Sequence, residues 1–259
     1  MTTNPPDPPT LVLVPCFSGA AWGPDQQHPF APLPVRAPRL PDDLDDLERY
    51  ADALTAEVAD LGRYVLVGDS FGAAVALALA VRQPPGLTGL VLSGGFAGDP
   101  LTTVVSRAGS HLARWMPGAL YRQVTLRVHA RLLRSPYDSA PGAEVRWSLR
   151  MSRRLFVEAT GWSSYTARVR AARRADLRDR LGRVRVPTLV LTPSYDHLVG
   201  EAATAVLARG IPGARLVVLE DTGHLFRFTH PRRYAAAVCT FLDQVGVASV
   251  RTAVPAAVP

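Results

Sequence analysis

Short apolar runs that alternate with longer amphipathic stretches constrain the fold of this chain more than any other feature. Each run is rich in Val and Leu and has the length of a buried strand. The strands are predicted at residues 10–15, 64–67, 87–93, 186–191 and 215–219, with a short one near 35–37. Strands that alternate with helices and are buried on both faces are typical of parallel sheets. The sequence therefore predicts an α/β protein with a mainly parallel central sheet and helices on both of its faces.

Helical periodicity fills most of the intervals between these strands. The clearest helix is predicted over residues 42–61, where four aspartates crowd the first turn and favour the positive end of the helix dipole. Further helices are predicted at residues 73–82, 201–209 and 231–246. Each of these helices has an apolar side that can cover the sheet.

The alternation is interrupted between the third long strand and the next one. In this interval apolar residues recur at helical spacing, as in Trp147, Met151 and Leu155, so we expect several amphipathic helices inserted between sheet strands. The expected organisation is a disordered tail at 1–9, core at 10–98, the helical insert at 99–183, core at 184–246 and a loose tail at 247–259.

The charge of the chain is concentrated in this insert. All 29 basic residues are arginine and the net charge is +7. Residues 100–185 hold 18 arginines against five acidic residues, whereas the rest of the chain is net negative. Such a surface can simply be solvated, or it can attract an anionic substrate or an anionic acyl carrier. No basic-aromatic motif or nucleic-acid module is present, so we expect no nucleic-acid partner.

The composition excludes several classes of protein. Apolar residues make up 47% and charged residues 20%, which is typical of a globular chain. The two cysteines, Cys16 and Cys239, are too few for a disulfide scaffold or a Cys-based zinc site. The first residues do not resemble a signal peptide, and no stretch approaches the roughly 20 apolar residues that cross a bilayer. We expect a cytoplasmic, bacterial protein that makes no membrane contact.

Residues 68–72, Gly-Asp-Ser-Phe-Gly, match the pattern Gly-x-Ser-x-Gly. They follow a predicted strand and open a predicted helix, which is the context that a nucleophile elbow requires. In so sharp a turn, side chains two residues either side of the serine would collide, and glycine avoids this. The start of the helix also directs free backbone N–H groups toward whatever Ser70 attacks. The alternative is a tight turn whose serine only caps the helix.

A serine becomes a nucleophile when a base takes its proton and a carboxylate orients that base. Of the six histidines, His224 is the one that lies in a polar loop between a predicted strand and the last helix. Asp196 follows the first strand after the insert, at the sheet edge where open α/β sheets bind ligands. Asp99 is the alternative acid, whereas Asp69 is badly placed to reach the imidazole. The sequence predicts Ser70, His224 and Asp196 as nucleophile, base and acid.

The elbow motif and the order Ser70, Asp196, His224 resemble the α/β-hydrolase family. The resemblance covers residues 10–98 and 184–245. It implies that the insert is a helical cap or lid, which commonly shapes the substrate pocket in this family.

The same resemblance implies an oxyanion hole formed by the backbone N–H groups of Phe17 and Phe71. Two departures from the family stand near it. Pro15-Cys16 occupies the positions at which many relatives have His-Gly, and residues 39–42 are shorter than the Gly-rich loop of those relatives. The pocket wall is expected to differ there.

The function expected from these residues is hydrolysis of a carboxylic ester, or of a thioester or lactone, through an acyl-enzyme. We expect a small-molecule acyl substrate, no metal and no organic cofactor. Trp22, Trp115 and Trp147 are candidates for an apolar acyl pocket, with core packing as the alternative. Cofactor-free haloperoxidases, hydroxynitrile lyases and carbon–carbon bond hydrolases share the scaffold and stay open, as does a receptor that binds without hydrolysis. The oligomeric state is not indicated by the sequence.

Overall fold

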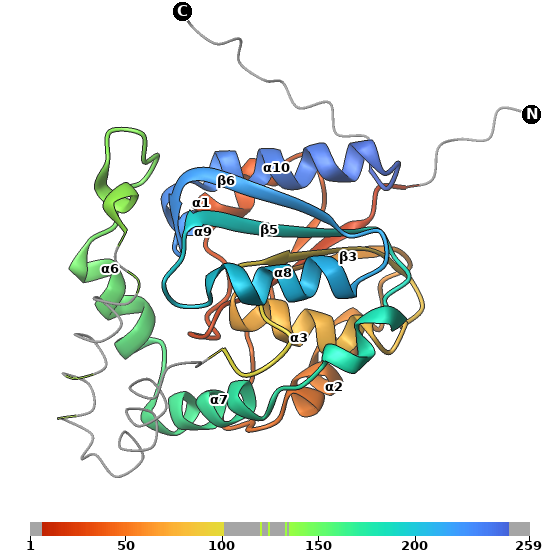
Figure 1. Ribbon diagram of the computed structural model, residues 1–259, viewed down its shortest axis with the longest axis horizontal. Coiled ribbons are helices and arrows are strands. Elements are labelled where there is room, and N and C mark those ends of the chain that lie inside the picture. Colours follow the sequence, from red (N-terminus) through yellow and green to blue (C-terminus); the bar gives the residue numbers. More distant parts are fainter. Residues whose placement is uncertain (1–6, 101–119, 121–123, 125–132, 134, 249–259) are drawn as a thin grey trace, which may run out of the picture.

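The computed structural model describes residues 7–100, 120, 124, 133 and 135–248 (Figure 1). Strands in these residues form one six-stranded parallel sheet in the order β2-β1-β3-β4-β5-β6. The strands are β1 (Thr10–Val14), β2 (Val35–Arg36), β3 (Tyr64–Asp69), β4 (Leu87–Ser93), β5 (Thr188–Tyr195) and β6 (Arg215–Gly223). The predicted α/β class and the predicted parallel sheet are both confirmed.

Alternation along each strand divides the core into two layers. In β1, Leu11 and Leu13 point into one apolar cluster and Val12 and Val14 into the other. Because both clusters are covered by helices, the strand is apolar at every position rather than at every second one. This is why the sequence shows continuous Val and Leu runs.

Helices cover both faces of the sheet, as predicted (Figure 1). One face is covered by α1 (Pro24–Gln27) and α10 (Pro231–Gln244), with the short α9 (Phe226–Thr229) leading into α10. The other face is covered by α2 (Leu47–Val58), α3 (Phe71–Ala80) and α8 (Gly200–Gly210). Every residue of the Ala-rich α3 is buried, which makes α3 the central helix of its layer.

The inserted segment between β4 and β5 is described continuously from residue 135 onward. Its elements are η2 (Pro136–Ser139), α6 (Leu149–Arg153), the π-helical turn η3 (Arg154–Glu158), α7 (Trp162–Arg174) and η4 (Arg178–Arg183). Figure 1 shows α6 beside one end of the sheet and α7 below the helical layer that contains α2 and α3. The spacing of Trp147, Met151 and Leu155 predicts one helix through all three residues. Instead, Trp147 precedes α6, Met151 lies in α6 and Leu155 lies in η3. Residues 101–119 of the predicted insert lie outside the described residues.

The helix predicted over 42–61 is shorter than expected, and the first-turn position predicted for its four aspartates was wrong. Helix α2 begins only after Asp46, whose side chain accepts a hydrogen bond from a first-turn N–H and caps the helix. Asp42 and Asp45 lie before the helix and pair with Arg168 and Arg170 of α7. The acidic run therefore binds the inserted segment instead of filling the first helical turn.

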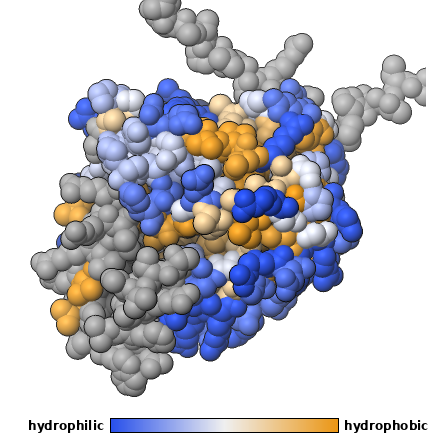
Figure 2. Space-filling view, in the orientation of Figure 1, coloured by the Kyte–Doolittle hydropathy of each residue, from blue (hydrophilic) through white to orange (hydrophobic). Residues whose placement is uncertain are grey.

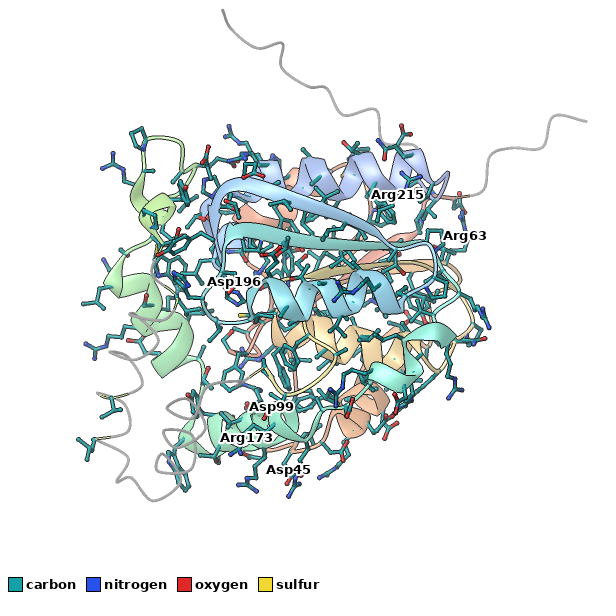
Figure 3. The ribbon with its side chains drawn as sticks, in the orientation of Figure 1. Asp45, Arg63, Asp99, Arg173, Asp196 and Arg215 are labelled. Carbon is teal, nitrogen blue, oxygen red and sulfur yellow. The ribbon has the colours of Figure 1, made fainter. Side chains whose placement is uncertain are left out.

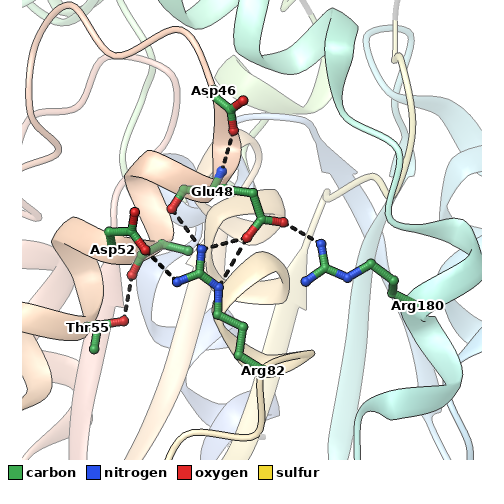
Figure 4. A network of polar contacts seen from close by, with 7 residues as sticks. Asp46, Glu48, Asp52, Thr55, Arg82 and Arg180 are labelled. Carbon is green, nitrogen blue, oxygen red and sulfur yellow. Dashed lines mark hydrogen bonds and ion pairs between the residues drawn. The ribbon is translucent and has the colours of Figure 1, made fainter.

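An ion-pair network fixes the return of the chain from the insert to the core (Figure 4). Arg82, just beyond α3, donates to the Glu48 carboxylate at 2.5 Å and to Asp52 at 2.6 Å, both on α2. Arg180 of η4 donates to the other oxygen of Glu48. Burial favours the neutral form of Glu48, but the two guanidinium groups outweigh this and lower its pKa. The network joins α2, α3 and η4 through one carboxylate.

Two residues assigned to the C-terminal tail pack against the core instead. Gly246 has a φ of 68°, which turns the chain back over α10. The Val247 N–H then donates to the Leu242 carbonyl at 2.9 Å, and Ala248 is buried. The tail expected at 247–259 therefore does not begin before residue 249.

Strand β6 lies at the edge of the sheet and exposes apolar side chains. Leu216, Val217 and Val218 of β6 are exposed, and Figure 2 shows that hydrophobic surface is present on this face of the molecule. Among the described helices, none combines the length and the apolar character that crossing a bilayer requires.

Candidate active site

The turn from β3 into α3 holds Ser70 in a strained conformation. Ser70 has φ 55° and ψ −115°, values that a non-glycine residue rarely adopts. A Cβ atom at Gly68 would lie 2.5 Å from the Ala73 Cα, and one at Gly72 would lie 2.3 Å from the Pro15 carbonyl oxygen. Both clashes are with backbone atoms that cannot move aside. The glycines of the sequence motif are therefore required by the packing of this turn.

Three side chains far apart in the sequence meet beside this turn. His224 Nε2 lies 3.0 Å from Ser70 Oγ, and His224 Nδ1 lies 2.8 Å from Asp196 Oδ2. All three residues are buried or nearly so. The distances form a continuous hydrogen-bonded chain from hydroxyl to imidazole to carboxylate.

The topology of the sheet explains why these residues meet. Ser70, Asp196 and His224 follow β3, β5 and β6, and parallel strands bring their carboxyl ends to one edge. In Figure 3, Asp196 lies at that edge, whereas Arg63 and Arg215 lie near the opposite edge, where β3 and β6 begin. The site faces the inserted segment.

Hydrogen bonds hold Asp196 in its ionised form. Its Oδ1 accepts the backbone N–H groups of Leu198 and Val199 at 2.9 and 3.0 Å. Burial alone would raise the pKa of Asp196, but the His224 imidazole and these two N–H groups outweigh burial and lower the pKa to about 2. The carboxylate is therefore charged at neutral pH.

Neighbouring carboxylates shift the pKa of His224, the base. Burial disfavours the charged form of His224, but Asp196 raises its pKa, with further contributions from the charges of Asp69 and Asp138. The net effect places the pKa of His224 above its ordinary value of 6.5. The imidazole is therefore ready to accept a proton.

The other residues weighed from the sequence lie elsewhere. The carboxylate that binds His224 is Asp196, so the alternative Asp99 is not its partner. The ring of His197 packs on Tyr195 with 4.3 Å between ring centroids. Asp69 accepts a hydrogen bond from Arg227, as its poor placement for the imidazole suggests.

Phe17 and Phe71, whose N–H groups are expected to form the oxyanion hole, lie next to each other. Their ring centroids are 5.8 Å apart in an edge-to-face arrangement. Phe71 opens α3, where backbone N–H groups have no intrahelical acceptor. The Phe17 carbonyl accepts a hydrogen bond from Arg168 at 3.1 Å, which fixes the loop after β1.

The three tryptophans expected near a pocket have different positions. Trp22 is only 2% exposed and packs among Phe30, Tyr234 and Arg227, so its expected place in the pocket is corrected to core packing. Trp147 packs on Phe228 and belongs to a small apolar cluster that includes Cys16, Leu225 and Leu198. This cluster contains the neighbour of His224 in sequence, so Trp147 stays a candidate. Trp115 lies outside the described residues.

A buried carboxyl group near the site was missed by sequence reasoning. Asp138 of η2 is 5% exposed, and its Oδ2 accepts the Ser135 N–H at 3.0 Å. Its Oδ1 is buried and has no hydrogen-bond partner among the described residues. Burial raises the pKa of Asp138 to about 6, although the Ser135 N–H opposes the shift. No motif or spacing in the sequence indicates this group.

A second missed residue is the fully buried Arg168 of α7. It donates to the carbonyls of Phe17, Ser18 and Pro41 and to the carboxylate of Asp42. Gly19 makes room for it, because a Cβ there would lie 2.4 Å from the guanidinium. One signal was available, since Arg168 lies on the helical stripe of buried alanines in α7. An arginine on such a stripe needs buried acceptors.

Several arginines of the insert form ion pairs within the molecule. Arg168, Arg170, Arg174 and Arg180 all pair with carboxylates of residues 42–48. This accounts for some of the positive excess noted in the sequence. The anionic partner that the excess suggests stays a prediction.

Comparison with known proteins identifies the family of this chain. The family model described as "Alpha/beta hydrolase family" matches residues 11–237, which is most of the chain. The chain belongs to the alpha/beta hydrolase family. This alpha/beta hydrolase is 25% identical to a proline iminopeptidase of Saccharolobus solfataricus over 218 residues, which cover 78% of this chain and 68% of that protein.

Two further likenesses place this alpha/beta hydrolase among enzymes of different names. A 2-hydroxy-6-oxononadienedioate/2-hydroxy-6-oxononatrienedioate hydrolase of Burkholderia vietnamiensis is 30% identical over 207 residues, covering 76% of this chain and 68% of that protein. The structure of a thermophilic esterase of Thermogutta terrifontis superposes with a TM-score of 0.74 at 22% identity, over 92% of this chain and 90% of that one, and shows the shared fold.

Proposed function

We propose that this alpha/beta hydrolase cleaves a carboxylic ester, or a related thioester or lactone, with Ser70, His224 and Asp196 as its catalytic triad. The observation that carries the proposal is the unbroken chain of hydrogen bonds from Ser70 Oγ through His224 to Asp196. The strained backbone of Ser70 supports it, because such strain persists where the surrounding structure holds a functional residue in place.

The proposed reaction has two stages. His224 Nε2 takes the proton of Ser70 as Oγ attacks the carbonyl carbon of the ester, and the carbonyl oxygen becomes an oxyanion. We assign the N–H groups of Phe17 and Phe71 to that oxyanion, where one such donor is typically worth about 3–4 kcal/mol. His224 then gives the proton to the departing alcohol. A water molecule, deprotonated by the same imidazole, releases the acid and restores Ser70.

Asp196 acts through the histidine. Its carboxylate accepts the Nδ1–H of His224, which leaves Nε2 free to take the proton of Ser70. The negative charge also stabilises the imidazolium that forms when the proton moves. We assign the described residues 135–183 of the insert to a cap over this edge of the sheet, since α6 lies beside it.

The relatives do not agree on a substrate, so the ester is chosen for its chemistry. They are named as a peptidase, as a hydrolase of a hydroxy-oxo diacid and as an esterase. An ester needs only the nucleophile, the base and the oxyanion donors, all of which this chain can supply. Hydrolysis of an amide or of a carbon–carbon bond demands more from the leaving-group side.

Labelling with a fluorophosphonate tests the proposal directly, because the reagent reacts only with an activated serine. We expect rapid labelling that mass spectrometry places on Ser70. We also expect Ser70→Ala to abolish the label and to lower kcat for p-nitrophenyl esters by about four to six orders of magnitude. A series of esters with increasing acyl chain length then measures the size of the pocket.

Ser163→Ala is the matched control, since Ser163 is an exposed serine on α7. Its labelling and turnover should equal those of the unaltered protein. Turnover that survives in Ser70→Ala would refute the triad. Absence of labelling in the unaltered protein would favour a receptor that binds without hydrolysis.

A further inference from the structure

Arg227 is a buried arginine with charged, polar and aromatic partners. Its side chain is 2% exposed, and its Nε donates to Asp69 Oδ2 at 2.7 Å. Its Nη1 donates to Gln26 Oε1 at 2.9 Å. The guanidinium lies between two aromatic rings, 3.8 Å from the Phe228 centroid and 4.1 Å from that of Trp22. Such a setting holds the planar guanidinium in one orientation.

The two members of this ion pair come from the two loops that carry the reacting side chains. Asp69 immediately precedes Ser70 at the end of β3, and Arg227 follows His224 by three residues, in α9. The Asp69–Arg227 bond therefore ties the nucleophile turn directly to the histidine loop. Gln26 extends the same contact to α1. The hydrogen bond between Ser70 and His224 spans the same two loops.

The pair also matters for charge. A lone carboxylate buried beside the imidazole would stabilise the protonated base, and a lone guanidinium would do the reverse. At the imidazole, each charge of the pair opposes the effect of the other. A buried charge without its partner is also costly for folding, so each member requires the other.

We propose that Arg227 is a positioning residue, which acts through Asp69 to hold the Ser70 turn against the His224 loop and to cancel the charge of Asp69 next to the imidazole. The inference rests on the proposed function, since it concerns the same serine and histidine. Neither Arg227 nor Asp69 touches the reacting atoms. Their effect is on the base and on its distance from the nucleophile.

The charged groups around His224 define what the test must separate. Asp196 approaches from the turn after β5, Asp138 from η2, and Asp69 from β3, with Arg227 behind Asp69. Removing Asp69 or Arg227 changes the local charge in opposite senses. A merely structural role predicts no such opposition.

The test measures the rate constant of fluorophosphonate labelling at Ser70 from pH 5 to 9. On the acidic side of this profile the rate constant rises as His224 loses its proton, and this rise is the acid limb. Asp69→Asn leaves a positive charge, so the limb should move to lower pH. Arg227→Gln leaves a negative charge, so the limb should move to higher pH. Each shift should be on the order of 0.5–1 pH unit, and the double variant should return the limb close to its original position. Limbs that stay in place, or move in the same direction, overturn the inference.

Two further variants keep the test decisive if Arg227→Gln does not fold. Arg227→Lys keeps the charge but loses the planar fork, so its limb should stay in place while the labelling rate on the plateau falls several-fold. Arg168→Gln removes an equally buried arginine that pairs with Asp42, and its limb should also stay in place. A shifted limb in Arg227→Lys contradicts the role of charge.

The inference and the proposed function fail in different ways. If the unaltered protein is not labelled at Ser70, the proposed function is wrong. If it is labelled and the limbs of Asp69→Asn and Arg227→Gln coincide, only the role of Arg227 is wrong.

Discussion

The carboxyl edge of the sheet and the inserted segment both bury charged side chains, but they satisfy them differently. At the sheet edge, Asp196 has its histidine and two backbone N–H groups, and Asp69 has Arg227. In the insert, one oxygen of Asp138 accepts an N–H, and the other has no hydrogen-bond partner within the part of the chain that the structure describes. Arg168 finds its acceptors in the core rather than in the insert.

The difference shows how partners decide the state of a buried acid. Both Asp196 and Asp138 are buried near His224, yet the pKa is lowered to about 2 in one and raised to about 6 in the other. Burial acts in the same direction on both groups, so the donors around each carboxyl make the difference. The charges at the sheet edge are fixed. In the insert, Asp138 titrates and Arg168 anchors the insert to the core.

The largest effect is expected when the fixed carboxylate of the sheet edge is removed. Asp196→Asn keeps the shape but presents an amide to His224 Nδ1, which favours the wrong tautomer of the imidazole. We expect kcat for the best p-nitrophenyl ester to fall about 10⁴-fold, with little change in the far-UV circular dichroism spectrum. A loss below tenfold would show that Asp196 does not orient the base.

The next largest effect is expected when Arg168, which anchors the insert to the core, is replaced. Arg168→Met leaves the carbonyls of Phe17, Ser18 and Pro41 without their donor in a buried place. We expect a loss of about 4 kcal/mol in the free energy of unfolding, measured by denaturant titration. Because Arg168 holds the loop that carries Phe17, kcat should fall more than KM rises.

Arg170→Met is the matched control, since it removes an arginine of the same helix that pairs with Asp45 in solvent. Its cost should be below about 0.5 kcal/mol. Equal losses in the two variants would mean that the buried contacts of Arg168 add nothing beyond a surface ion pair.

The sequence predicts the sheet edge far better than the insert, and the reason is physical. Glycines 68 and 72 are forced by backbone clashes at the elbow, and the parallel strands bring Ser70, Asp196 and His224 to one edge. Such local requirements leave motifs that can be recognised. The strand positions follow equally from continuous apolar runs.

Long-range polar contacts leave no comparable pattern. The aspartates before α2 were interpreted as helix-dipole residues because their partners on α7 lie more than 100 positions away in the sequence. Trp22 was predicted to line the pocket because no nearby residue in the sequence indicates that it packs against Arg227. Asp138 was missed because its burial depends on how η2 meets Gly223 at the end of β6.

The smallest effect is expected from the titrating carboxyl of the insert. The pKa of Asp138 is about 6 in the folded protein against an ordinary value of 3.8, so the folded state keeps a proton that the unfolded chain releases. Stability from this group is therefore present below about pH 4 and is lost as the pH rises to about 6. Asp138→Asn removes that dependence. Relative to the unaltered protein, the variant should gain up to about 3 kcal/mol between pH 4 and pH 7, measured by denaturant titration at each pH.

Activity separates Asp138 from Asp196 more clearly than stability does. Asp138→Asn removes a negative charge that raises the pKa of His224, so the acid limb of kcat/KM should move to lower pH. On the alkaline plateau of the profile, turnover should stay within about threefold of the unaltered protein, because His224 keeps its bond to Asp196. If Asp138→Asn instead lost as much turnover on that plateau as Asp196→Asn, the insert would contribute a catalytic group. The contrast between a fixed and a titrating carboxyl would then not hold.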